Sequence, residues 1–201
     1  MGKQSWKPGT MVYPVPAAMV SCGTLETPNI ITIAWTGTIC TNPPMTYVSV
    51  RKERYSYDLI KNSGSFVINL TTASLVKATD FCGVKSGRDT DKFKMTGLTA
   101  VPSVAVTAPS IFESPVNIEC KVTEIKELGS HDMFLAEVVN VTIDDQFMDK
   151  TGKFRLDKSG IICYSHGGYY SLGNLLGTFG YSVAKKKKRG KSTNTKRASK
   201  R

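Results

Sequence analysis

Residues 29–38, which read Asn-Ile-Ile-Thr-Ile-Ala-Trp-Thr-Gly-Thr, decide the fold class. The β-branched first half is typical of a buried strand, and small or hydroxyl-bearing residues follow at 36–38. Small residues let a planar ligand approach the backbone, and hydroxyl groups can donate hydrogen bonds to ring carbonyls. An ordinary strand end with a core tryptophan, Trp35, explains the same residues, and this segment alone favours that simpler interpretation.

The strand pattern continues on both sides of this stretch. β-rich runs occupy residues 45–50, 65–70, 116–126, 134–143 and 160–164. The third and fourth runs flank a turn-like segment at 128–132 and predict an antiparallel hairpin. The helix candidates are short: residues 56–62 with Ser56 as the N-cap, 75–81, and 172–179. This pattern predicts a mainly β protein, an antiparallel barrel with short helices; a doubly wound α/β fold would need longer, alternating helices.

The positive charge lies at one end of the chain. The 201 residues carry a net charge of +11, and residues 185–201 hold ten basic and no acidic side chains. Residues 1–184 hold 17 basic and 16 acidic side chains. The sequence therefore predicts one folded domain over 1–184 and a disordered basic tail over 185–201, because the tail has too few large apolar residues to offset its ordering entropy.

Cysteine usage and the N-terminus predict a cytoplasmic protein. The five cysteines are widely spaced without a Cys-x-x-Cys pair, and no apolar segment resembles a secretory signal or a membrane span. Two histidines do not supply a clustered ligand set, so no metal site is expected. Hydrolase, P-loop and Rossmann motifs are also missing, which leaves chemistry on a bound cofactor as the more open possibility.

Two segments have the residues of a phosphate site. In residues 49–56 a strand ends in a basic cluster directly before a predicted helix N-terminus, where N–H groups and the helix dipole favour anions. In residues 82–93 two glycines allow backbone amides to converge on an anion, with Arg88 and Lys92 adding positive charge. Each segment is equally compatible with a solvated surface loop.

Taken in order, these segments resemble the flavin reductase-like, FMN-binding split-barrel family, and its flavoredoxin members most closely. The resemblance covers about residues 8–181. It rests on Ala34-Trp35-x-Gly37, Pro43-Pro44, Arg51-x-x-Arg54-Tyr55-Ser56, Phe66-x-x-Asn69, Cys82-Gly83, Ser86-Gly87-Arg88 with Asp91-Lys92-Phe93, Glu119-Cys120, Gly129-x-His131-Asp132 and Tyr169-Tyr170-x-Leu172-Gly173.

The resemblance implies a homodimer of Greek-key split barrels with one FMN per subunit at or near the dimer interface. It places three groups of residues around the cofactor. The flavin and ribityl chain would contact Asn29, Trp35, Thr36 and Thr38; the phosphate would lie among Arg51, Lys52, Tyr55 and Ser56; and Ser86, Arg88 and Lys92 would reach in from a loop. His131 and Tyr164 would flank the flavin, although a structural role is the default for such a histidine. Lys92 could also lie near flavin N1 or O2 and stabilise the reduced anion.

The function implied is that of an oxidoreductase that passes electrons through bound FMN to a small-molecule or protein acceptor. The donor is expected to be NAD(P)H or another redox protein, and without a Rossmann motif a nicotinamide would have to lie directly on the exposed flavin face. The alternative is a non-catalytic FMN- or polyanion-binding protein whose basic tail contacts nucleic acid without sequence specificity.

Overall fold

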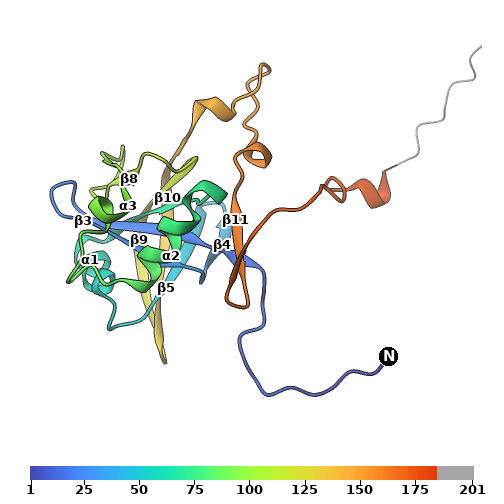
Figure 1. The fold of residues 1–201 in the computed structure, drawn as a ribbon, viewed down its shortest axis with the longest axis horizontal. Coiled ribbons are helices and arrows are strands. Elements are labelled where there is room, and N and C mark those ends of the chain that lie inside the picture. Colours follow the sequence, from blue (N-terminus) through green and yellow to red (C-terminus); the bar gives the residue numbers. More distant parts are fainter. Residues whose placement is uncertain (185–201) are drawn as a thin grey trace, which may run out of the picture.

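The computed structural model describes residues 1–184, and its main element is an antiparallel sheet of seven strands in the order β3-β2-β6-β9-β10-β5-β4 (Figure 1). The strands are β2 (Ala18–Gly23), β3 (Pro28–Ile33), β4 (Thr36–Thr41), β5 (Pro44–Val50), β6 (Ser65–Asn69), β9 (Val116–Leu128) and β10 (His131–Ile143). β9 and β10 pair along nearly their whole length. The hairpin predicted from the two long β-rich runs is therefore confirmed.

The sheet curls around one hydrophobic core. Val20 and Ile31 near one end of the strand order share a buried cluster with Val48 and Phe134 near the other end. β3 and β5 also contact each other, although they are not neighbours in the sheet. Because both ends of the sheet approach across one core, the architecture is a split barrel, and the predicted mainly β barrel class is confirmed.

β2 and β3 are buried on both faces, but only β3 was predicted, because its second half is β-branched whereas β2 has a single β-branched residue, Val20. All six residues of β2 are buried. On their outer face a second core cluster, which includes Met19, Ile30 and Phe93, packs β2 and β3 against the helices α2 (Val76–Val84) and α3 (Lys92–Thr96). A strand covered on both sides has no alternation of apolar and polar residues for a sequence pattern to detect.

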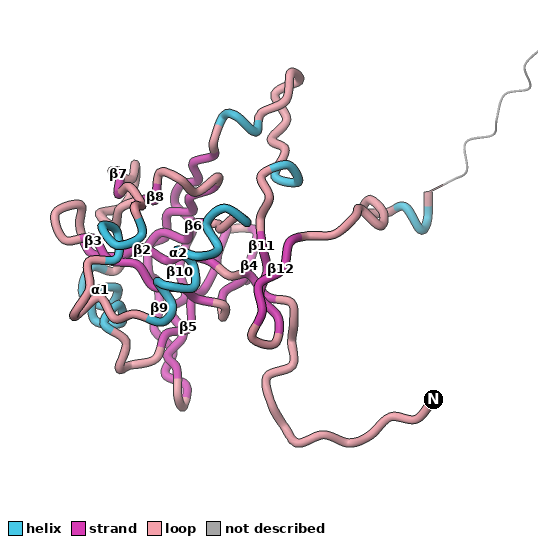
Figure 2. Tube along the Cα trace, viewed as in Figure 1, coloured by secondary structure: helices cyan, strands magenta, loops and turns pink. Residues whose placement is uncertain are grey.

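The helices and the smaller sheets lie outside the seven-stranded sheet (Figure 2). α1 (Tyr55–Ser63) follows β5, and single turns of 3-10 helix are η1 (Ala73–Leu75), η2 (Asp145–Phe147), η3 (Leu156–Lys158) and η4 (Tyr181–Val183). β7 (Ala100–Val101) pairs with β8 (Ser110–Ile111). β1 (Val15–Pro16), β11 (Ile162–Ser165) and β12 (Gly168–Ser171) form a three-stranded sheet of their own.

Two helix predictions are wrong in detail. Residues 172–179 form no helix: they leave the body after β12 with their leucines exposed, so no apolar face is packed that would hold a helix together. Ser56 is not an N-cap; α1 begins one residue earlier, after Arg54, and Ser56 is buried inside its first turn. Cys82 and Gly83, predicted in a loop, belong to the last turn of α2, and the loop is confined to 85–91.

The predicted basic tail at 185–201 lies outside the described residues. Within the described part, no helix is both long and apolar enough to cross a membrane. The same residues hold no group of three or more metal-ligating side chains.

Candidate functional site

Two adjoining cavities lie where β3, β5, α1 and α2 meet. The first, called here the ring cavity, measures about 440 Å³ and has Ile31, Ile33 and Trp35 along one side and His131 near them. The second, called here the basic cavity, measures about 270 Å³. Ile31 and Arg54 line both, so the two cavities adjoin at these residues, and together they are called here the cleft.

Apolar and aromatic side chains make up much of the lining of the ring cavity. The end of β3 with the small residue Ala34, called here the β3 floor, is part of this lining. The rings of Trp35 and His131 meet edge to face, with their centroids 6.0 Å apart. Burial, reinforced by the charge of Arg51, holds the pKa of His131 below its usual value. His131 is therefore neutral at physiological pH and offers one N–H donor and one acceptor.

Positively charged side chains line the basic cavity next to the start of α1. Its lining includes Arg54, Lys85, Arg88 and Lys92, together with the hydroxyl-bearing Ser86 and the buried Ser56. The Ser56 hydroxyl accepts a hydrogen bond from Asn29 Nδ2 at 2.8 Å. Cationic side chains, hydroxyl groups and the N-terminal end of a nine-residue helix in one cavity are the chemistry of a phosphate site.

Gly87 brings the 85–91 loop against α1. A Cβ atom at this position would lie 2.0 Å from Asn29 Oδ1 and 2.8 Å from a ring carbon of Tyr55. Only glycine allows this approach, which closes the basic cavity over the start of the helix. The guanidinium of Arg88 then donates to the backbone carbonyl of Glu53 at 3.0 Å, which ties the loop to the turn between β5 and α1.

Lys92 is buried in the wall of the basic cavity. Its Nζ donates to the carbonyl oxygens of Ile30 at 2.6 Å and of Cys82 at 2.8 Å. Burial lowers its pKa from the usual lysine value. The ammonium group thus joins β3 to α2 and places a positive charge in the basic cavity; it does not line the ring cavity.

A buried carboxylate joins β10 to α1. Asp132 follows His131 in β10, and it accepts a hydrogen bond from the Tyr57 hydroxyl of α1 at 2.7 Å. Lys52 Nζ lies 3.4 Å from the same carboxylate. The hydrogen bond from Tyr57 keeps the pKa of Asp132 below its usual value. The carboxylate is therefore charged and fixes α1 relative to the strand that carries His131.

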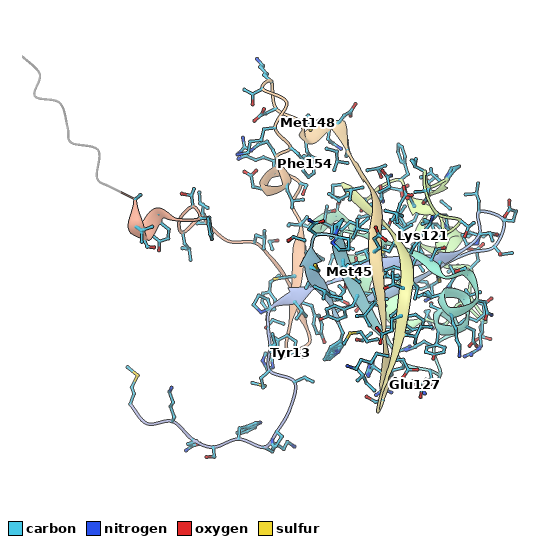
Figure 3. All side chains as sticks on the ribbon, turned by 180° about the vertical axis from the view of Figure 1, so that it is seen from behind. Tyr13, Met45, Lys121, Glu127, Met148 and Phe154 are labelled. Atoms are coloured by element: carbon cyan, nitrogen blue, oxygen red, sulfur yellow. The ribbon has the colours of Figure 1, made fainter. Side chains whose placement is uncertain are left out.

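The outer wall of the ring cavity comes from the small three-stranded sheet. Tyr164 lies between Tyr13 and Tyr169, with ring centroids 6.4 and 5.5 Å away. Tyr13 lies at the entry to β1, beside this sheet (Figure 3). The Tyr169 hydroxyl donates to Asp80 of α2 at 3.2 Å, so the wall is linked to the body across the cavity mouth.

The structure brings most of the predicted site residues together. Trp35, Arg51, His131 and Tyr164 line the ring cavity; Tyr55, Ser56, Ser86, Arg88 and Lys92 line the basic cavity; and Asn29 stands behind Ser56. Asn29 and three other predicted residues line neither cavity. Lys52 is paired with Asp132, Thr36 donates to the carbonyl of Tyr47 at 2.6 Å, and Thr38 is exposed on the edge strand β4.

Sequence reasoning missed other residues of the cleft. Arg54, Lys85, Tyr13 and Tyr169 line it but were not among the predicted contacts. Arg54 lies within the basic cluster at the strand end, so its position next to the helix start was a usable signal. Tyr13 lies far from the rest of the site in sequence and had no such signal.

Comparison with known proteins identifies the family. Residues 10–173 match the model of the flavin reductase like domain, and the chain belongs to this family. Flavoredoxin of Desulfovibrio vulgaris (Miyazaki F) superposes with a TM-score of 0.84 and 32% identity over 91% of this chain and 100% of that one. Flavoredoxin from Methanosarcina acetivorans gives 0.83 and 27% over 92% and 100%. An uncharacterized protein of Archaeoglobus fulgidus is 35% identical over 138 residues, 69% of this chain and 77% of its own.

Proposed function

We propose that this protein is an FMN-binding oxidoreductase of the flavin reductase and flavoredoxin type. The observation that carries the proposal is the cleft, in which a ring cavity with apolar and aromatic side chains in its lining adjoins a basic cavity at Ile31 and Arg54. A flavin mononucleotide has the same order of chemistry: a planar ring, a polyhydroxyl chain and one phosphate. When bound, FMN would supply a ring that accepts electrons from a donor and passes them to an acceptor.

Different side chains would bind the phosphate and the ring of FMN. Arg54, Arg88 and Lys92 would neutralise the phosphate, and Ser56 and Ser86 would donate hydroxyl hydrogen bonds to it. The β3 floor would cover one face of the ring and exclude water from it. His131, neutral because burial lowers its pKa, would present an N–H group or a lone pair at the ring edge.

The other side of the ring cavity provides access for a reaction partner. The tyrosine wall and Asp80 border this side, where a planar donor or acceptor could stack on aromatic rings. We propose NAD(P)H or a redox protein as the electron donor and a small molecule or protein as the acceptor. We also propose that two copies of the chain associate as a dimer.

Flavin binding is tested on the purified full-length protein. We expect flavin absorbance bands that bleach on reduction, and restoration of the bands when the apoprotein is mixed with FMN. Stopped-flow reduction by NADH, NADPH and reduced ferredoxin then identifies the donor from the fastest rate. An apoprotein that binds neither FMN nor riboflavin in a fluorescence titration would contradict the proposed function.

A further inference from the structure

The C-terminal arm, defined here as residues 172–184, is apolar but unpacked. It leaves the body after β12 and runs outward (Figure 1). Leu175 and Leu176 are 80% and 94% exposed, and Phe179, Tyr181 and Val183 are also exposed. The arm contains no charged residue. Leaving so many large apolar side chains in water is unfavourable, because each one forgoes roughly 1.5–3 kcal/mol of burial.

An apolar groove lies at the root of this arm. It has a volume of about 320 Å³ and runs between β1, the start of β11 and the chain after β6. The residues that line it are Pro14, Val15, Pro16, Ala17, Ala18, Leu70, Thr71, Ile161, Ile162, Cys163 and Leu172. None of them is charged, so the groove matches the arm in polarity.

We propose that the C-terminal arm of one copy of this chain occupies the apolar groove of a second copy, and that the exchange is mutual. Leu172 is both the first residue of the arm and part of the groove lining. A two-fold axis beside Leu172 would therefore bring each arm root next to the partner's groove and close the assembly as a dimer. The arm has ample reach, because about eleven extended residues span roughly 36 Å.

The N-terminal arm, residues 1–12, is the competing occupant. It also leads to the groove, since β1 follows it, and Trp6 is 79% exposed. It differs in charge, because Lys3 and Lys7 would have to stay in water while their neighbours entered an uncharged groove. The uncharged C-terminal arm is the better match.

The exchange would also support the redox site. Ala17 lines both the groove and the ring cavity, and Cys163 of the groove precedes Tyr164 of the cavity wall in β11. An arm in the groove would therefore brace the wall from behind. This consequence rests on the proposed function, whereas the exchange itself does not depend on flavin.

Disulfide trapping tests the exchange directly. Cysteine is placed singly at Leu175, Leu176 and Phe179, and each full-length variant is oxidised with diamide to join the new thiol to Cys163. We expect at least one variant to give a covalent dimer of twice the chain mass on a non-reducing gel. The matched control is Trp6→Cys, whose side chain has nearly the same exposure as Leu175. The dimer should be absent in this control and in trapping variants that also carry Cys163→Ser.

The outcomes separate the possibilities. Linkage within one chain, linkage that survives Cys163→Ser, equal trapping by Trp6→Cys, or no trapping at any of the three positions would each overturn the exchange. As a second measurement, sedimentation equilibrium should show at least tenfold weaker self-association for the Leu175→Asp/Leu176→Asp double variant. Leu25→Asp, in the β2–β3 turn, is the surface control. Trapping in a protein that binds no flavin would support the exchange and contradict the proposed function, so the two failures are distinguishable.

Discussion

Replacing Arg54 with alanine should weaken the binding of FMN without weakening the binding of riboflavin, which lacks the phosphate. Arg54 lines both cavities at their junction. Among residues 1–184 it has no ion-pair partner, whereas the neighbouring Arg51 is held by Glu53 at 3.0 Å. The positive charge of Arg54 is therefore available to a ligand.

The size of the effect follows from this geometry. A hydrogen bond to a charged group contributes about 1.5–3 kcal/mol, and Arg54 is exposed, so the lower end of that range applies. A loss of about 1.4 kcal/mol corresponds to a tenfold increase in Kd. We expect roughly tenfold weaker FMN binding by Arg54→Ala, and less than about threefold by Arg51→Ala, because the Arg51 guanidinium already has a carboxylate partner.

The assay is titration of the apoprotein with FMN and with riboflavin, followed by flavin fluorescence. Comparing the two ligands in the parent protein and in Arg54→Ala isolates the contribution of the phosphate, as a double-mutant cycle does. If Arg54→Ala weakens FMN and riboflavin equally, or weakens neither, Arg54 does not bind the phosphate and the order of the two cavities is wrong.

Three further substitutions test the supporting contacts. Gly87→Ala should lower FMN affinity, because its Cβ would clash with Asn29 and Tyr55 and push the loop away from α1; Gly129→Ala, whose Cβ would meet nothing within 4 Å, is the titration control. Lys92→Met should lower the free energy of unfolding by about 2–4 kcal/mol in urea, because two carbonyl oxygens lose their donor, whereas Lys94→Met on the exposed side of α3 should change it little. The hydrogen bond from the tyrosine hydroxyl of α1 lowers the pKa of Asp132 in the folded protein. The charged carboxylate therefore stabilises the fold above its unfolded pKa of about 3.9, and this stabilisation is lost as the pH falls through the folded pKa. Urea unfolding from pH 5 to 3 should therefore show a smaller loss of stability in Asp132→Asn than in the parent; equal slopes would contradict this.

Local patterns predicted most strands of the large sheet, from alternation or from β-branched residues. The alternation in β5 and the two long β-rich runs of β9 and β10 led to the correct hairpin, because every second side chain on these strands faces the core. The same reasoning failed for β2, which has one β-branched residue and no alternation, and for residues 172–179, whose apolar residues follow a helical spacing although Leu175, Leu176 and Phe179 are exposed. The local pattern of apolar residues does not reveal which other parts of the fold will pack against a segment.

The candidate site, like the fold, was predicted in part from the sequence and in part required the tertiary structure. The sequence by itself determined the family resemblance, the mainly β class and the chemistry of residues 29–38, 49–56 and 82–93, because each depends on neighbouring residues in the chain. Only the tertiary structure decided that Tyr13 and Tyr169 form one wall of the ring cavity and that Arg54 lies where the two cavities join. It also showed that the Thr36 hydroxyl donates a hydrogen bond to the backbone carbonyl of Tyr47 in β5. These outcomes depend on how the sheet curls and where α2 packs, which are properties of the whole barrel rather than of any short segment.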